Sequence, residues 1–320
     1  MENHSSPRHY LNRKVTFILL FVVVITVLFF NTLSPRGFKP GTIVLIERGE
    51  SIKSVSKDLK NKNIIKSSTF FNLYIQLSRK STIASGEYLF EKPSSVFSVA
   101  KRIKNADYGL PTSLVTLTEG MTNQEMAEVL STKFPKISKD EFTQRANSLE
   151  GYLFPDTYKF NSNVTVDGVL MTLRENFENK IQSAGDSIKN SKYSLEQIII
   201  MASIVEAEST ADGRTEVASI LWKRFEMNMP LQVDAPFVYT IGKGTADLTI
   251  DDLKSDSLYN TYTRTGLTPT AIGNPGLESI IAAANPQPTQ NLYFLTGRDG
   301  KMYYAKSFEG HKQNRALYLD

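Results

Sequence analysis

Residues 15–33 form a run of 19 residues with no charged side chain, and no other stretch constrains the folding of this chain as strongly. About 20 predominantly apolar residues are enough for a helix to cross a bilayer. Arg13 and Lys14 precede the run, so the positive-inside rule places residues 1–14 in the cytoplasm and the chain after the run outside it. The sequence therefore predicts a single-pass anchor in the cytoplasmic membrane at residues 15–33, followed by a linker at residues 34–40.

A cleaved signal peptide is the alternative explanation of this apolar run. The apolar region of a signal peptide is usually about 7–15 residues long and ends at a small-residue cleavage site. Residues 15–33 are longer than that, and no A-x-A pattern follows them. We therefore favour a retained anchor over a cleaved leader.

The composition narrows the chemistry that the rest of the chain can perform. There is no cysteine, which excludes disulfides, thiol catalysis and cysteine-ligated zinc. His4 and His9 lie in the N-terminal tail, and His311 alone cannot build a multi-histidine metal site. We assign His311 no role beyond helix capping, and we expect neither a metal ion nor a cofactor.

The charge of the chain gives little support to a nucleic-acid partner. The formal net charge is +4, but Arg8, Arg13 and Lys14 lie in the tail, where only Glu2 opposes them. The rest of the chain is therefore nearly balanced and lacks the basic excess that nucleic-acid binding needs. We expect no nucleic-acid partner.

Three strand–turn–helix units follow the linker, at residues 42–59, 86–103 and 113–130. The turn of the first is Gly49-Glu50-Ser51, and this unit resembles a LysM peptidoglycan-binding module, although a generic strand–helix unit is the alternative. We expect a small LysM-like α+β module at residues 41–110 and a larger mixed α+β catalytic domain at residues 112–320. Helices and short strands alternate irregularly in the larger domain, which indicates the α+β class.

Local signals predict several elements of the larger domain. Ser194 with Gln197 is a capping box that starts a helix near residue 195. Asn274 followed by proline predicts the cap and first residue of a later helix. A β-hairpin is predicted from residues 292–296 and 301–305.

Glu206 is the leading candidate for chemistry because it ends an apolar helix. At 100° per residue, one stripe of that helix contains Leu195, Ile199, Ala202 and Glu206. A carboxyl group in an apolar wall has a raised pKa, which keeps it protonated near neutral pH and able to donate a proton. The structural alternative is a salt bridge from Glu206 to Arg214 or Lys223. Glu208 projects about 200° away and is expected to reach solvent or the backbone of residues 210–213.

Five stretches occur together in the order found in a known family. They are LEGYLFPDTY (149–158), ASIVEAE (202–208), MPLQVD (229–234), YNTYTRTGL (259–267) and AIGNPG (271–276). On these motifs the chain, from about residue 41 to residue 319, resembles the endolytic murein transglycosylases, the MltG/YceG-like family.

This resemblance implies a specific activity. Such enzymes cleave peptidoglycan glycan strands internally, between N-acetylmuramic acid and N-acetylglucosamine, and leave a 1,6-anhydromuramyl end. The family's catalytic glutamate is the first one in ASIVEAE, which is Glu206 here. Peptidoglycan glycan strands are then the substrate, and the cell-wall synthesis machinery is a candidate partner of the anchored enzyme.

The implied reaction needs only one carboxylate. The muramyl C6 hydroxyl attacks the anomeric carbon within the same sugar, so no second carboxylate has to activate water. Glu206 would first protonate the leaving oxygen and then accept the proton of that hydroxyl. The bound geometry would make this attack effectively unimolecular.

Other polar residues in the family motifs are secondary candidates. Gln232, Asn260 and Tyr262 offer amide and phenol groups suited to acetamido sugars, and the alternative for each is local bonding within its loop. Asp234 and Glu150 are candidates for a second carboxylate.

Two differences from the family's usual sequence motifs lie in loops near these residues. The chain has Ala235 and Pro236 where the family often has proline and threonine, and it has GLTPT at residues 266–270 in place of GLPPG. The family's loop geometry and sugar-subsite preference are therefore not carried over to this chain, while Glu206 keeps its place.

Two other functions compete with the transglycosylase. A muramidase would hydrolyse the same bond with water, using Glu206 and either Asp234 or Glu150. A membrane-anchored scaffold would bind the wall without cleaving it. The inward placement expected for Glu206 favours an enzyme, and the resemblance favours the transglycosylase.

Overall fold

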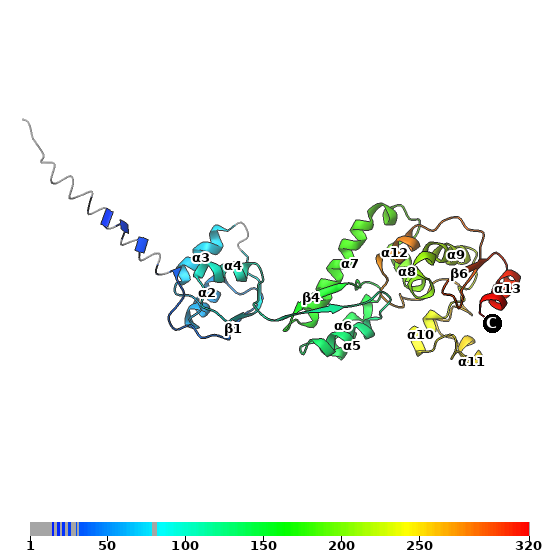
Figure 1. The fold of residues 1–320 in the computed structure, drawn as a ribbon, viewed down its shortest axis with the longest axis horizontal. Coiled ribbons are helices and arrows are strands. Elements are labelled where there is room, and N and C mark those ends of the chain that lie inside the picture. Colours follow the sequence, from blue (N-terminus) through cyan, green and yellow to red (C-terminus); the bar gives the residue numbers. More distant parts are fainter. Residues whose placement is uncertain are drawn as a thin grey trace, which may run out of the picture. The chain divides into compact units, whose positions relative to one another are not determined.

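The structure, a computed structural model, describes residues 32–78 and 82–319, together with residues 15, 18, 19, 21, 22, 25, 26 and 30. It divides into two compact units, residues 1–111 and residues 112–320, which are described separately below (Figure 1). The predicted tail at residues 1–14 and nine of the 19 residues of the predicted anchor at residues 15–33 lie outside the described residues. Among the residues that are described, no helix is both long and apolar enough to cross a membrane.

The first unit is built from two antiparallel strands and three helices. In chain order its elements are β1 (Thr42–Ile46), α2 (Ile52–Asn61), α3 (Ser68–Leu77), β2 (Gly86–Phe90) and α4 (Val96–Lys104). Strand β1 pairs with β2 so that Thr42 lies opposite Phe90. Each helix begins at a serine whose hydroxyl accepts a backbone N–H three residues later.

Alternation along β1 sets the inner face of this unit. Val44 and Ile46 are buried while Ile43 and Leu45 are exposed, as expected for a strand that covers a core on one side. The first two predicted strand–turn–helix units are confirmed as β1 with α2 and β2 with α4. The LysM-like character of the unit stays a prediction.

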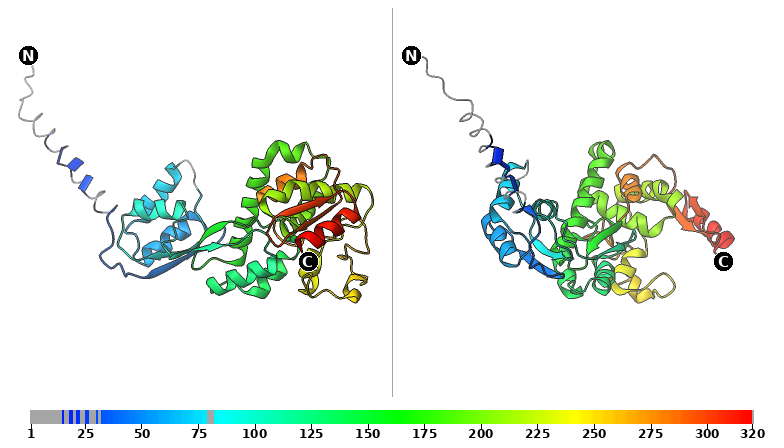
Figure 2. Two further views of the ribbon diagram at one scale, coloured as in Figure 1. Left: turned by 45° about the vertical axis from the view of Figure 1, so that its right-hand side comes forward. Right: turned by 60° about the vertical axis from the view of Figure 1, so that its left-hand side comes forward.

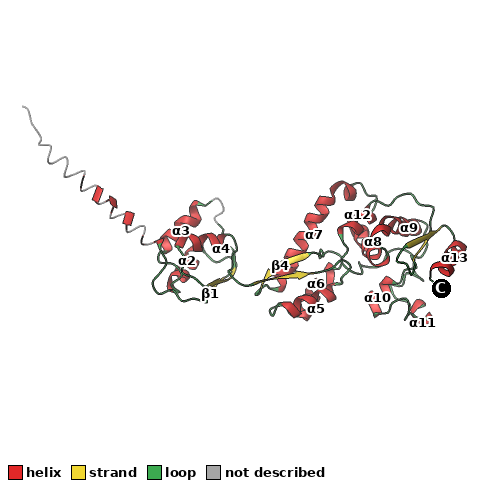
Figure 3. Ribbon diagram, viewed as in Figure 1, coloured by secondary structure: helices red, strands yellow, loops and turns green. Residues whose placement is uncertain are grey.

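The second unit contains the remaining α-helices and strands. They are β3 (Thr112–Thr116), α5 (Asn123–Lys133), α6 (Lys139–Ala146), β4 (Thr157–Asn161), α7 (Val166–Lys189), α8 (Leu195–Glu208), α9 (Arg214–Glu226), α10 (Ala235–Ile241), α11 (Ile250–Leu253), α12 (Leu277–Ala284), β5 (Tyr293–Thr296), β6 (Met302–Ala305) and α13 (Phe308–Tyr318). Helices dominate, and the strands form two-stranded antiparallel sheets between them (Figure 3). The predicted α+β class is confirmed.

The third predicted strand–turn–helix unit is β3 with α5, and it belongs to the second compact unit. Strand β3 pairs with β4, with Thr112 opposite Asn161. Helices α5 and α6 and the beginning of α7 bury one core against this sheet. The loop between β3 and α5 is thereby held at a fixed place in the unit.

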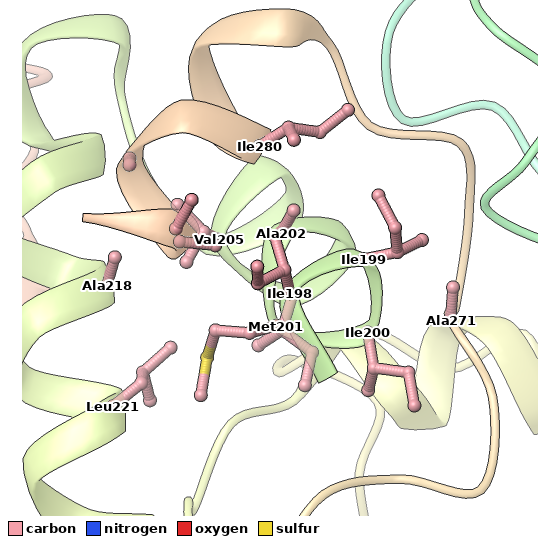
Figure 4. Packing of buried hydrophobic residues seen from close by; sticks show 14 of the residues in the cluster. Ile198, Ile199, Ile200, Met201, Ala202, Val205, Ala218, Leu221, Ala271 and Ile280 are labelled. Atoms are coloured by element: carbon pink, nitrogen blue, oxygen red, sulfur yellow. The ribbon is translucent and has the colours of Figure 1, made fainter. Parts of the chain in front are cut away.

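Helix α8 is the centre of a second core in this unit. Helices α9 and α12 pack directly against it, and Figure 4 shows Leu221 of α9 and Ile280 of α12 among the apolar side chains around it. All eight residues from Ile198 to Val205 are buried. The prediction of one inward-facing stripe is therefore wrong, because neighbours cover α8 on every side from Ile198 to Val205, while Leu195 at its start is exposed.

The C-terminal part of the second unit contains the predicted hairpin. Strands β5 and β6 pair with Tyr293 opposite Ala305, and α13 packs against both strands (Figure 2). This prediction is confirmed. His311 lies inside α13, whose N-terminal cap is Ser307, so the expected capping role of His311 is wrong. Its ring instead stacks against Tyr293 at 5.5 Å between centroids.

Candidate active site

Glu206 lies in the last turn of α8, at the point where the helix leaves the core. The predicted capping box of Ser194 and Gln197 is present and fixes where the helix starts. The Glu206 side chain is 9% exposed. Glu206 Oε1 accepts a hydrogen bond from Arg214 Nη2 at 3.1 Å, and Oε2 accepts one from the backbone N–H of Gly276 at 3.0 Å.

These contacts decide between the two interpretations of Glu206. The salt bridge to Arg214 is present, so Glu206 is not an unpaired carboxyl group in an apolar wall. Arg214 begins α9, and Gly276 caps the N-terminus of α12. A cation, a backbone donor and the positive end of a helix all favour a negatively charged carboxylate. Glu206 as observed is therefore placed to accept a proton.

A second carboxylate shares the same arginine. Glu119, in the loop between β3 and α5, lies with Oε2 at 3.4 Å from Arg214 Nη2, and its side chain is 47% exposed. Partial burial raises the pKa of Glu119, and the nearby charge of Glu206 raises it further, while Arg214 opposes both effects. A Cβ added at Gly276 would lie 2.0 Å from Glu119 Oε1, so a side chain there would displace this carboxylate. Glu119 was not among the predicted site residues; the signal for it was its position three residues before Thr122, the N-cap of α5.

Glu208 lies in a different environment from Glu206. The prediction that it reaches solvent or residues 210–213 is wrong, because Glu208 Oε1 accepts the backbone N–H of Ala235, at the start of α10, at 3.0 Å. Burial raises the pKa of Glu208 to about 7; the nearby charge of Asp234 adds to the rise, and the Ala235 N–H opposes it. Glu208 is thus a carboxyl group held in place by a backbone donor, with no cationic partner among the residues that the structure describes.

An open cleft of about 680 Å³ adjoins these residues. Its lining includes Gly120, Glu125, Glu128, Glu208, Asp234 and Tyr239. Gly120 lines this cleft and also lies next to Glu206, since a Cβ added at Gly120 would lie 3.7 Å from Glu206 Cγ. Through Gly120 this cleft adjoins the Glu206 side chain.

The three predicted sugar-binding residues have different surroundings. Gln232 is exposed, and its backbone has a positive φ of 51°. Asn260 is buried, and its side-chain amide donates to the carbonyls of Leu253 and Ser255. The Tyr262 hydroxyl donates to Asp234 Oδ1 at 2.6 Å. Asn260 therefore makes the loop contacts named as its alternative, while Gln232 and the Tyr262–Asp234 pair stay candidates for ligand contact.

Asn274 holds three loops of the site together. The prediction that it caps a helix is wrong, since Gly276 is the cap and α12 begins at residue 277. Asn274 is 0% exposed, and its Oδ1 accepts the backbone N–H groups of Gly151 and Leu153 at 3.1 and 2.9 Å. Its Nδ2 donates to the Met121 carbonyl at 2.9 Å. The loop that carries the Gly276 N–H is therefore fixed to the rest of the site through Asn274.

Glu150, one of the two candidates for a second carboxylate, belongs to this same bonded group. Glu150 Oε1 accepts the backbone N–H of Asn123 at 3.0 Å, and Oε2 lies 3.4 Å from the Tyr239 hydroxyl. Burial raises the pKa of Glu150 to about 7, and the two hydrogen bonds oppose that rise. The Glu150 oxygens are thus engaged by Asn123 and Tyr239. Glu119, in contrast, shares the Arg214 guanidinium with Glu206.

The fold and the site define an α+β protein in which a buried helix ends in an arginine-bound carboxylate beside a cleft. The chain belongs to the YceG-like family, whose model matches residues 44–316. The predicted family membership is confirmed.

Curated relatives and a solved structure agree with this assignment. An endolytic murein transglycosylase of Bacillus subtilis (strain 168) is 28% identical over 302 residues, which cover 86% of this chain and 84% of that protein. One from Streptococcus pneumoniae (strain D39) is 24% identical, and the match covers 86% of this chain and 58% of the longer relative. The crystal structure of a yceG-like protein from Listeria monocytogenes matches 86% of this chain and 99% of its own, with a TM-score of 0.57 and 28% identity.

Proposed function

We propose that this chain is a lytic transglycosylase that cleaves peptidoglycan glycan strands internally, between N-acetylmuramic acid and N-acetylglucosamine. The family and its relatives named endolytic murein transglycosylases support this class of enzyme. The single observation that carries the assignment of the chemistry is Glu206, a carboxylate at the end of a buried helix, bonded to Arg214 and Gly276 and adjoining a cleft through Gly120.

In the proposed reaction Glu206 acts first as an acid and then as a base. It donates a proton to the glycosidic oxygen as the bond from that oxygen to the anomeric carbon breaks. The muramyl C6 hydroxyl then bonds to the anomeric carbon and gives its proton to Glu206, which closes the 1,6-anhydro ring. The Arg214 guanidinium and the Gly276 N–H stabilise the carboxylate that exists between the two steps.

Substrate binding is proposed for the cleft beside Glu208 and Asp234. Its volume of about 680 Å³ lies within the range of ordinary ligand sites. Gln232 and Tyr262 are proposed to contact the acetamido sugars from its margin. Asn260 contributes by ordering the loop that carries Tyr262, since Asn260 Oδ1 accepts the Tyr262 backbone N–H at 3.0 Å.

The chemical form of the new muramic acid end distinguishes the proposed transglycosylase from a muramidase and from a non-catalytic scaffold. Purified glycan strands are digested in water enriched in oxygen-18, and the muramic acid ends are weighed by mass spectrometry. A transglycosylase gives ends that lack the mass of one water and carry no oxygen-18. A muramidase gives reducing ends that carry the heavy oxygen, and a scaffold leaves the strands intact; either result would refute the proposal.

The membrane anchor at residues 15–33 is also proposed, on the strength of its apolar length and of Arg13 and Lys14. Residues 34–320 then lie outside the cytoplasm, where peptidoglycan is, with the first compact unit proposed to add affinity for the wall and the synthesis machinery a candidate partner. Protease added to intact spheroplasts should degrade the part of the chain after the anchor. Complete protection of that part would contradict this orientation.

A further inference from the structure

Arg214 contacts both carboxylates of the site through one nitrogen atom. Its Nη2 lies 3.1 Å from Glu206 Oε1 and 3.4 Å from Glu119 Oε2. Its Nε is buried and has no hydrogen-bond partner in the part of the chain that the structure describes. The guanidinium therefore forms a bidentate pair with neither Glu206 nor Glu119. It lies between these two carboxylates, which compete for it.

This arrangement raises a question about the proton that the proposed reaction needs. A general acid must hold its proton before the substrate reacts. Glu206 as observed accepts from Arg214 and from Gly276, and both contacts favour its charged form, which cannot donate a proton. Some neighbouring group must therefore draw Arg214 away from Glu206 while the proton is held.

We propose, resting on the transglycosylase function above, that Arg214 alternates between Glu119 and Glu206, so that Glu119 is the positioning residue that lets Glu206 carry the catalytic proton. With Arg214 on Glu119, Glu206 is neutral and protonates the glycosidic oxygen. When that proton leaves, Arg214 returns to Glu206 and stabilises the new carboxylate. The C6 hydroxyl then gives its proton to Glu206, Arg214 goes back to Glu119, and no proton is gained or lost over the cycle.

The charges around the pair are consistent with this exchange. Partial burial raises the pKa of Glu119, the charges of Glu206 and of Glu278 in the first turn of α12 raise it further, and Arg214 lowers it. Glu208, on the same helix as Glu206, has its carboxylate bonded at Ala235. Arg214 is thus the cation that the two carboxylates share, and a negative charge on one of them disfavours a negative charge on the other.

The test is the pH profile of kcat/KM for Glu119→Gln in the full chain. Gln keeps the size of the side chain but removes the charge that competes for Arg214, so Glu206 loses its proton more readily. The pH at which activity falls on the alkaline side should therefore move down by about one unit or more, which is the usual effect of a nearby charge. At acidic pH the variant should recover a kcat/KM close to that of the wild type.

A second variant and a control make the outcome decisive. Arg214→Met removes the shared cation and should move the same limb to higher pH, because two adjacent carboxylates hold a proton more tightly. Glu309→Gln, on exposed α13 and paired with Lys312, should leave the profile unchanged. A pH profile of folded Glu119→Gln that superimposes on the wild type, or a uniform loss of rate at every pH, would overturn the proposal.

Failure of the proposed function gives a different result. If wild-type protein released no anhydro ends at any pH, the transglycosylase assignment itself would be wrong. If wild-type protein were active and only the Glu119→Gln shift were missing, the enzyme assignment would stand and the alternation of Arg214 would be refuted.

Discussion

Two carboxylates lie two residues apart at the end of α8, and their surroundings differ. On one side Glu206 accepts from a guanidinium and a backbone N–H, with a second carboxylate close by. On the other side Glu208 accepts the backbone N–H of Ala235, and its burial raises its pKa to about 7. Glu206 is bound by the guanidinium of a side chain, Arg214, which the proposal above treats as mobile. Glu208 is bound by a backbone N–H, that of Ala235, which is fixed by the fold.

This difference shows that the helix position of a carboxylate does not determine its chemistry. Helical periodicity favoured Glu206 as the inward residue and Glu208 as the outward one. Both are in fact partly enclosed, because α10 and the loop before α12 cover the end of α8 from two directions. The groups brought to each carboxylate by distant segments set its charge state.

The largest effect on the Glu206 side is expected from Asn274→Ala. This change removes an amide that accepts from Gly151 and Leu153 and donates to Met121 in a fully buried place. Leaving these groups unpaired should lower the free energy of unfolding by about 3 kcal/mol and free the Gly276 loop from Glu206. Urea unfolding measures the loss. Asn285→Ala, at the other end of α12 with one contact to the Ile281 carbonyl, is the matched control and should cost less than about 1 kcal/mol.

On the Glu208 side, a pH-dependent change in stability is expected from Glu208→Gln. Folding raises the pKa of Glu208 from 4.5 to about 7, so the folded state binds more protons than the unfolded state between these values. The free energy of unfolding of the wild type should therefore fall as pH rises through this window. The variant should lack about 2 kcal/mol of that fall, since each pKa unit is worth about 1.4 kcal/mol and partial exposure weakens the effect.

Unfolding curves for Glu208→Gln at pH 4.5 and pH 8 measure this difference. Glu309→Gln, on an exposed helix, should follow the wild type at both pH values. An equal fall with pH in Glu208→Gln and in the wild type would show that Glu208 titrates as an ordinary exposed carboxylate.

The smallest effect on stability is expected from Glu206→Gln. The amide keeps the shape of the carboxylate, but its single oxygen can accept from only one of Arg214 and the Gly276 N–H, and its nitrogen is a donor. Arg214 keeps Glu119 as a partner. Because one charge-assisted hydrogen bond is lost in a partly buried place, the free energy of unfolding should fall by about 1 kcal/mol. An unpaired Glu206 would instead gain stability on this change. A rise in melting temperature would therefore contradict the Arg214 contact.

Features of the fold that depend on neighbouring residues could be predicted from the sequence. The capping box at Ser194 and the β5–β6 hairpin depend on residues close together in the chain, and both are present. The pairing of β3 with β4 joins residues more than 40 positions apart, and no local pattern encoded it. Burial of α8 on all sides likewise depends on α9 and α12 rather than on its own periodicity.

The residues of the candidate site also fall into those that local sequence could predict and those that only the tertiary fold brings together. Glu206 could be found because an apolar helix and a family motif both end there. Its contact with Arg214 was open as an alternative, since the two residues are eight positions apart. Glu119 lies 95 residues from Arg214, and Asn274 more than 120 residues from Gly151, so the tertiary fold alone brings them together. A helix-cap pattern at Asn274 was misleading because its side chain binds these distant loops instead.

Release of anhydromuramyl ends by Glu206→Gln and Glu208→Gln, assayed side by side with the wild type at one pH, tests the central claim most directly. Gln at position 206 cannot donate and recover a proton, so its rate should fall by about 10³-fold or more. Gln at position 208 keeps the bond to Ala235 and should stay within about tenfold of the wild type. Retained activity in Glu206→Gln, or an equal loss in both folded variants, would contradict the assignment of Glu206 as the acid and base.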